Sequence, residues 1–134
     1  MTNSKALSTL IVSDFNAQHL AGYLNSDIEI PNIDATVAPF GQVVQTLTDF
    51  SLPCWHEPPK LVIVWTRPQS VLGSFNAVLE HSQAPIDTCL GEVDTYCHLL
   101  TNVAERVMAV FVPIWVVSAH DRGLGMIDLK SEYG

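Results

Sequence analysis

Short apolar runs rich in β-branched residues alternate along this chain with segments of helical periodicity, and this alternation constrains the fold most strongly. Strands are expected at residues 9–12, 33–38, 61–65 and 110–112. Helices are expected where apolar side chains recur every three or four positions, at residues 17–24, 43–50, 71–79 and 85–107. Residues 51–60 contain three prolines and are expected to form a loop.

Strands that alternate with helices form a parallel sheet with helices on both of its faces. We therefore expect an α/β protein, a three-layer α/β/α sandwich with a mainly parallel sheet of about four strands. With 134 residues, the chain is expected to form one domain, with a glycine-rich tail at residues 118–134. The apolar run at residues 109–117 is too short to span a bilayer and suits a buried strand. Trp55, Trp65 and Trp115 are expected in the core, although the positions of Trp65 and Trp115 at strand ends also suit a pocket mouth.

Acidic residues dominate the charge of the chain. Fourteen Asp and Glu outweigh six Lys and Arg, for a formal charge of -8, so we expect neither nucleic-acid binding nor attraction to anionic lipid. No GxGxxG or GxxxxGK[ST] motif is present and no His or Cys pair has metal-ligand spacing, so no cofactor and no metal are expected. The odd number of cysteines and the lack of a signal peptide favour reduced thiols and a cytoplasmic location.

Polar residues follow three of the expected strands, at the carboxyl ends where parallel α/β sheets bind their ligands. The candidate binding residues at these ends are Ser13, Asp14, Asn16, Gly41, Gln42, Thr66 and Arg67. The turn after the first strand could present helical N–H groups to an anion, or its polar side chains could cap the next helix. An arginine at such an edge can clamp a carboxylate or phosphate, or it can be a surface residue that pairs with the excess acids.

The densest polar cluster is the sequence His120-Asp121-Arg122-Gly123-Leu124-Gly125. His120 is a candidate general base, with Ser13 or Cys54 as the nucleophile, and Arg122 is a candidate anion anchor. The alternative is an exposed loop in which the glycines form turns. The two interpretations differ in whether His120 lies within hydrogen-bond reach of a nucleophile.

Five blocks of sequence together resemble the amino-terminal domain of FkbH-like proteins. They are VSDFNAQ at residues 12–18, TVAPFGQV at 36–43, VWTRP at 64–68, VFVPIW at 110–115 and HDRGLGMIDL at 120–129. The resemblance implies a sandwich similar to SGNH/GDSL hydrolases and to flavodoxin, with strand order 2-1-3-4. In that family a phosphatase-like domain of the haloacid dehalogenase superfamily follows. This chain ends at Gly134, before such a domain, so we expect the sandwich to be incomplete at its C-terminus.

The resemblance also implies that the hydrolase residues are lost. Its register puts Phe15 where SGNH hydrolases carry their serine nucleophile, and Thr66-Arg67-Pro68 where they carry an asparagine. Gly41 matches the glycine that donates an oxyanion N–H. The expected function is therefore that of a non-catalytic module. The alternative is a small ester or thioester hydrolase or acyltransferase with a rearranged site that uses Ser13 and His120.

The pathways and partners expected for this chain come from the same resemblance. Full-length FkbH-like proteins are implicated in forming glyceryl thioesters on acyl carrier protein in bacterial polyketide pathways, and others belong to surface-polysaccharide biosynthesis. The implied partners are an acyl carrier protein, a downstream phosphatase-like domain, or a small acyl or anionic ligand. Because an acyl carrier protein is itself usually acidic, the charge of -8 opposes that partner unless Arg67, Arg122 and Lys130 cluster. Apolar surface left uncovered would favour a homodimer.

Overall fold

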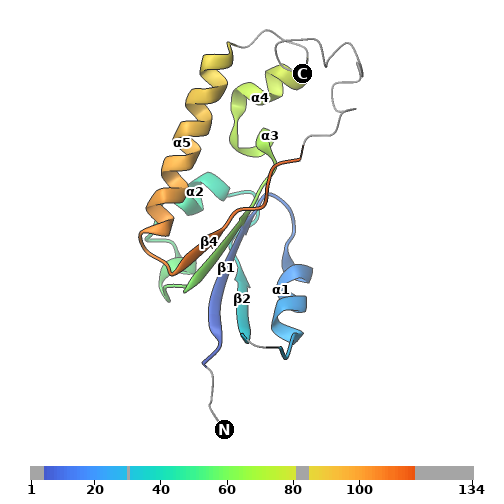
Figure 1. The fold of residues 1–134 in the computed structure, drawn as a ribbon, viewed down its shortest axis with the longest axis vertical. Helices are drawn as coiled ribbons and strands as arrows, with labels where there is room; N and C mark the ends of the chain where they lie inside the picture. Colours follow the sequence, from blue (N-terminus) through green and yellow to red (C-terminus); the bar gives the residue numbers. More distant parts are fainter. Residues whose placement is uncertain (1–4, 30, 81–84, 117–134) are drawn as a thin grey trace. The chain divides into compact units, whose positions relative to one another are not determined.

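The computed structural model describes residues 5–29, 31–80 and 85–116 (Figure 1). The elements are β1 (Leu7–Ser13), α1 (Gln18–Ser26), β2 (Ile33–Val37), α2 (Val43–Thr48), the 3-10 helix η1 (Pro53–Trp55), β3 (Leu61–Trp65), α3 (Pro68–Val71), α4 (Gly73–Leu79), α5 (Ile86–Ala104) and β4 (Ala109–Phe111). They form two compact units, of which the first comprises residues 1–66 and 99–113 and the second residues 67–98 and 114–134. The tail at 118–134, with His120 and Arg122, lies outside the described residues.

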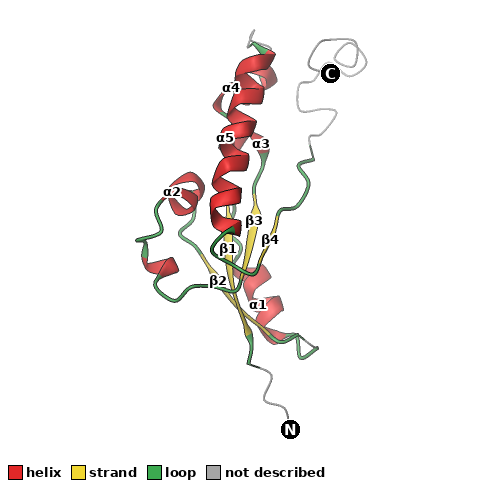
Figure 2. Cartoon of the chain, turned by 60° about the vertical axis from the view of Figure 1, so that its left-hand side comes forward, coloured by secondary structure: helices red, strands yellow, loops and turns green. Residues whose placement is uncertain are grey.

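The first unit contains a four-stranded sheet in the order β2-β1-β3-β4, and all of its strand pairs are parallel (Figure 2). Ile11 of β1 pairs with Val37 of β2 and Ile63 of β3, and Ser13 pairs with Trp65. This arrangement confirms the expected α/β class and strand order. Because the strands are parallel, their carboxyl ends share one edge of the sheet.

The core of the first unit lies on both faces of β1, whose residues from Thr9 to Ser13 are all buried. On one face Ile11 packs with Ala35 and with Ala17 and Ala21 of the α1 region. Alternation along the strand directs Leu10 to the other face. Figure 1 shows α1 on one side of the sheet and α2, with the end of α5, on the other. Burial of each large aliphatic side chain contributes about 1.5–3 kcal/mol, which makes β1 the centre of stability in this unit.

The second unit is helical over its described residues. Glu92 of α5 accepts hydrogen bonds from the backbone N–H of Ser74, at 3.0 Å through Oε2, and from the Ser74 hydroxyl. The carboxylate thereby satisfies a donor at the start of α4, where an intrahelical partner is lacking. The rings of Tyr96 and Trp115 stack with their centroids 5.4 Å apart.

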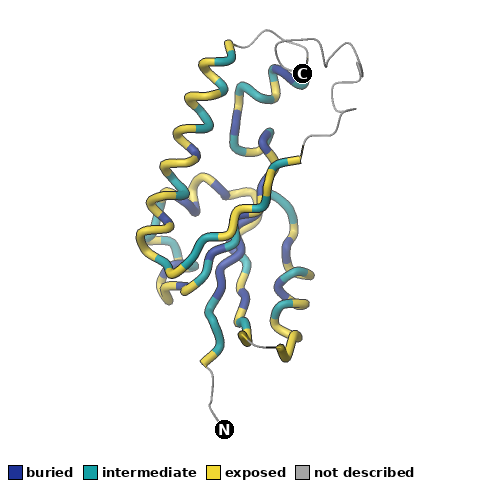
Figure 3. The backbone as a smooth tube through the Cα atoms, in the orientation of Figure 1, coloured by how far each residue is buried: buried dark blue, intermediate teal, exposed yellow. Residues whose placement is uncertain are grey.

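The last strand differs from its expectation. The apolar run at residues 109–117 suits a buried strand, but β4 lies at the edge of the sheet and ends at Phe111, which is 54% exposed. Pro113 has no backbone N–H to continue the ladder, so the pairing stops ahead of it. Figure 3 shows the contrast between the buried centre of the sheet and β4, which is half-buried at Ala109 and Val110 and exposed at Phe111.

Candidate functional site

The turn after β1 places a buried hydroxyl at the carboxyl edge of the sheet. Ser13 is only 4% exposed, and its Oγ donates a 2.7 Å hydrogen bond to the backbone carbonyl of Phe15. Asn16 Oδ1 accepts from the backbone N–H of Gln18 at 3.1 Å, a local turn bond that leads into α1, whose N-cap residue is Ala17 and has no side-chain capping bond. Asp14 is half-buried beside them. The Ser13 hydroxyl is thus engaged within its own turn.

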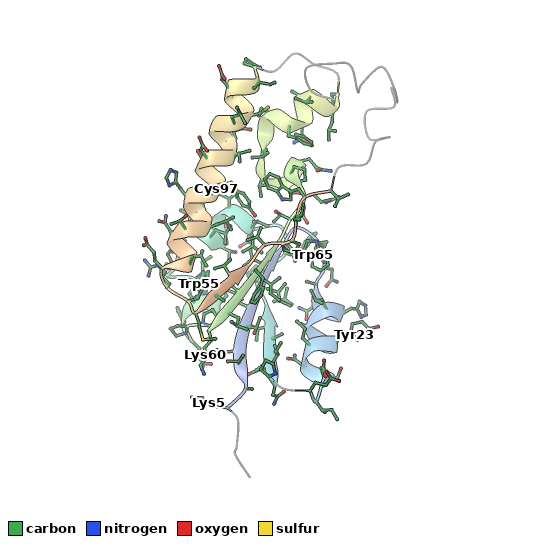
Figure 4. The ribbon with its side chains drawn as sticks, viewed as in Figure 1. Lys5, Tyr23, Trp55, Lys60, Trp65 and Cys97 are labelled. Carbon is green, nitrogen blue, oxygen red and sulfur yellow. The ribbon has the colours of Figure 1, made fainter. Side chains whose placement is uncertain are left out.

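An aromatic pair lies beside this turn. The ring of Phe15 meets the ring of Trp65 edge to face, with centroids 5.5 Å apart and an interplanar angle of 89°. Phe15 also packs on the core cluster around Ile11, whereas Trp65, at the end of β3, is 43% exposed (Figure 4). The expectation of a core position is therefore wrong for Trp65, although it is confirmed for the buried Trp55. The position that the resemblance assigns to a nucleophile holds an apolar ring.

The turn after β2 adds an exposed ring and a glycine to the same edge. Gly41 has φ +74°, in the left-handed region that side chains other than glycine rarely adopt. This conformation turns the chain into α2, where the carbonyl of Gln42 accepts from the N–H of Thr46 at 2.8 Å. Phe40, just before the glycine, is 68% exposed. The turn therefore presents an apolar ring to solvent.

The turn after β3 separates a buried residue from an exposed one. Thr66 is buried, while Arg67 is exposed, has an extended backbone and directly precedes α3. Thr66 belongs to the first unit and Arg67 to the second. Of the expected binding residues, Ser13, Gly41 and Thr66 thus share one edge of one unit.

The second candidate nucleophile lies at the other end of the strands. Cys54 belongs to η1 and lines a cavity with Ser8 of β1, Asp34 of β2 and Lys60, residues near the beginnings of their strands. Burial raises the pKa of the Cys54 thiol, which disfavours the reactive thiolate. Ser13 and Cys54 therefore belong to separate places in the fold.

The described part of the chain contains neither a group of residues suited to a metal ion nor a helix suited to crossing a membrane. Over these residues, no three His, Cys, Asp or Glu side chains are grouped so that they could hold a metal ion. Likewise, none of the helices formed by residues 5–29, 31–80 and 85–116 is long and apolar enough to cross a membrane.

Comparisons with protein-family models, with curated proteins and with solved structures found no match. The family resemblance stays a prediction. The residues themselves describe a carboxyl edge at which Trp65 and Phe40 are exposed around a buried, hydrogen-bonded Ser13. Sequence reasoning gave Trp65 a pocket-mouth position only as the alternative to a core position, and it did not single out Phe40. The signal that could have found them is their position, since both lie where a strand gives way to a turn.

Proposed function

We propose that this chain is a non-catalytic binding module, similar to the amino-terminal domain of FkbH-like proteins, that holds a small acyl group at the carboxyl edge of its sheet. The observation that carries the proposal is the aromatic pair of Phe15 and Trp65, at the place where a related hydrolase would keep its nucleophile. Exposed aromatic rings bind apolar groups well, because they bury a large area with little loss of side-chain freedom.

An acyl thioester fits this edge better than a free anion does. Its acyl chain is apolar and can pack on Trp65 and Phe40, and its carbonyl needs only a hydrogen-bond donor such as a backbone N–H in the turns. The charge of -8 opposes the docking of an acidic carrier protein but not the docking of the uncharged acyl-pantetheine end of its arm. Arg67, the exposed basic residue that follows Thr66, would contact a carrier protein or a downstream phosphatase-like domain.

The test is a titration of the ¹⁵N-labelled chain with S-acetyl-pantetheine, followed by amide chemical shifts. We expect shifts at Phe15, Gly41 and Thr66, and we expect Trp65→Ala to abolish them. Tyr23→Ala is the matched control, since Tyr23 is an aromatic residue 75% exposed on α1, away from this edge (Figure 4). Shifts that avoid the carboxyl edge, or that survive in Trp65→Ala, would contradict the proposal.

The non-catalytic part has a separate test, labelling with a serine-reactive fluorophosphonate. We expect no labelling that depends on Ser13, because its hydroxyl is buried and donates to Phe15. Stoichiometric labelling that disappears in Ser13→Ala would instead favour the hydrolase or acyltransferase alternative. In that case a base such as His120 would have to reach Ser13.

A further inference from the structure

A second place suited to a ligand lies in the first unit, near the beginnings of the strands. A cavity of about 280 Å³ is lined by Phe50, Trp55, Pro58, Pro59, Arg106 and Val107. A larger cavity of about 1010 Å³ shares Pro58 and Pro59 with it. In Figure 4, Trp55 and Lys60 lie toward the end of the sheet opposite Trp65. None of the candidate residues at the carboxyl edge lines either cavity.

The walls of the small cavity are held in place by the fold. The indole N–H of Trp55 donates to the backbone carbonyl of Thr46 at 2.9 Å, and the rings of Phe50 and Trp55 meet with centroids 5.0 Å apart. The carboxylate of Asp49 accepts from both the N–H and the hydroxyl of Ser51, at 2.9 and 2.6 Å. Because these contacts lie within the chain itself, binding would need little ordering of the walls.

Arg106 is the one charged residue in this lining, and its guanidinium stacks on an aromatic ring. Its guanidinium carbon lies 3.9 Å from the centroid of the Phe50 ring. Although the chain has fourteen acidic residues for six basic ones, no carboxylate in the described part of the chain pairs with Arg106. Stacking uses the face of a guanidinium and leaves the N–H donors along its edge for an acceptor.

Backbone hydrogen bonds on both sides of Arg106 fix the position of the Cα atom that carries its side chain. The N–H of Arg106 donates to the carbonyl of Val103 at 2.9 Å, just beyond the end of α5. Two residues later, the N–H of Met108 donates to the carbonyl of Lys60 at 2.8 Å, at the start of β3. The turn that carries Arg106 is therefore tied at both ends to regular structure.

We propose that this cavity binds a small monocarboxylate with an apolar body. The carboxylate oxygens would accept hydrogen bonds from the guanidinium N–H groups of Arg106. The apolar part of the ligand would pack against Trp55 and the two prolines. One cation and five apolar residues line the cavity, which matches a single negative charge attached to an apolar group. A phosphate dianion would need further positive charge in the lining.

The test uses the full chain, labelled with ¹⁵N, and phenylacetate as the probe. For a ligand of about ten non-hydrogen atoms we expect a Kd on the order of 1 mM, a range suited to chemical-shift titration. Shifts are expected at Phe50, Val107 and the Trp55 indole. Arg106→Gln should weaken phenylacetate binding by about tenfold or more, because a charge-assisted pair is lost. Gln18→Glu, an exposed position on α1 that lines neither cavity, makes the same change in net charge and should leave phenylacetate binding unchanged.

Two further comparisons, one with an uncharged ligand and one with a second variant, make the result decisive. Phenylacetamide has the same body without the charge, and it should bind the natural chain about tenfold more weakly than phenylacetate does. To Arg106→Gln, the amide and the acid should bind with equal affinity. Phe50→Leu, which removes the ring under the guanidinium, should also weaken phenylacetate binding. Equal binding of the acid and the amide to the natural chain would overturn the proposal, as would tighter binding of inorganic phosphate or full affinity in Arg106→Gln.

Discussion

Thr46 illustrates how a single buried polar atom affects this fold. The residue is fully buried in α2, and its Oγ1 has no hydrogen-bond partner within the described structure. Its backbone groups are satisfied, since the N–H donates to Gln42 and the carbonyl accepts from Trp55. An unsatisfied buried hydroxyl carries a desolvation cost without a compensating bond.

We predict that Thr46→Val stabilises the protein by about 1 kcal/mol, measured by urea denaturation. Both residues are β-branched and similar in shape, so the change removes the hydroxyl with little repacking. Thr48→Val is the control in the same helix, because Thr48 is exposed and its Oγ1 donates to Val44 at 2.7 Å. The control should not be stabilised. A destabilised Thr46→Val would show that the hydroxyl has a partner, such as an ordered water.

Cys54 is a second residue whose surroundings determine its chemistry. Burial raises the pKa of its thiol, with partial opposition from its own backbone N–H. Because the thiolate is the nucleophile, a raised pKa lowers the reactive fraction at neutral pH.

We predict that Cys54 reacts with iodoacetamide more slowly than the exposed Cys97 at neutral pH. Its rate should keep rising above the ordinary pKa of a cysteine, about 8.5. Mass spectrometry of each cysteine-containing peptide over a pH series measures both rates. Preferential reaction of Cys54 at neutral pH would point to an activated thiol and would revive Cys54 as a nucleophile.

At the scale of elements, the two edges of the sheet differ in how they are protected. On the β2 side, the carboxamide of Asn25 at the end of α1 accepts from the N–H of Ala35 at 2.6 Å and donates to its carbonyl at 3.0 Å. This clamp satisfies both backbone groups of one residue at the outer edge of the strand. It also ties α1 to β2, and it occupies groups that another strand could otherwise pair with.

We predict that Asn25→Ala lowers the free energy of unfolding by about 1–2 kcal/mol, since two hydrogen bonds to the backbone are lost. Asn102→Ala, in the exposed part of α5, should change it by less than about 0.5 kcal/mol. Chemical denaturation compares the two variants. Equal stabilities would mean that water replaces the clamp without cost.

At the scale of the whole molecule, the β4 edge of the sheet is open to pairing with a second copy of the chain. Residues 107–117 contain no charge, β4 is the last strand of the sheet, and Phe111 is exposed there. Natural edge strands usually carry a lysine, a bulge or another device against pairing. A neutral edge is also where two copies of a chain with charge -8 repel each other least.

We predict concentration-dependent self-association of the natural chain and its reduction by Phe111→Lys, measured by sedimentation velocity. Ile28→Lys, at an exposed apolar residue in the loop after α1, has the same charge change and should leave self-association intact. If both variants reduce it equally, net charge rather than the β4 edge controls association. If the natural chain stays monomeric at every concentration, the edge is protected in another way.

Much of the fold could be predicted because its signals are local. The β-branched runs at β1 and β3 and the amphipathic stripe of α1 depend on neighbours in sequence, and alternation of strand and helix favours parallel pairing. The grouping of Ser13, Gly41 and Thr66 at one edge follows from the same rule. For Trp65 the strand-end position left a core position and a pocket mouth both open, because the exposure of its ring depends on what covers the end of β3 in the folded chain.

The sequence by itself determined the α/β class, the strands and the turn that places Phe15 after β1. Tertiary structure alone decided the contacts between segments that are distant in sequence. These are the meeting of Phe15 with Trp65, the clamp of Asn25 on Ala35 and the position of Arg106 over Phe50. The physical reason is that residue patterns specify periodicity and burial along each element. Which side chains face one another depends on the register and packing of elements, which form together only in the folded chain.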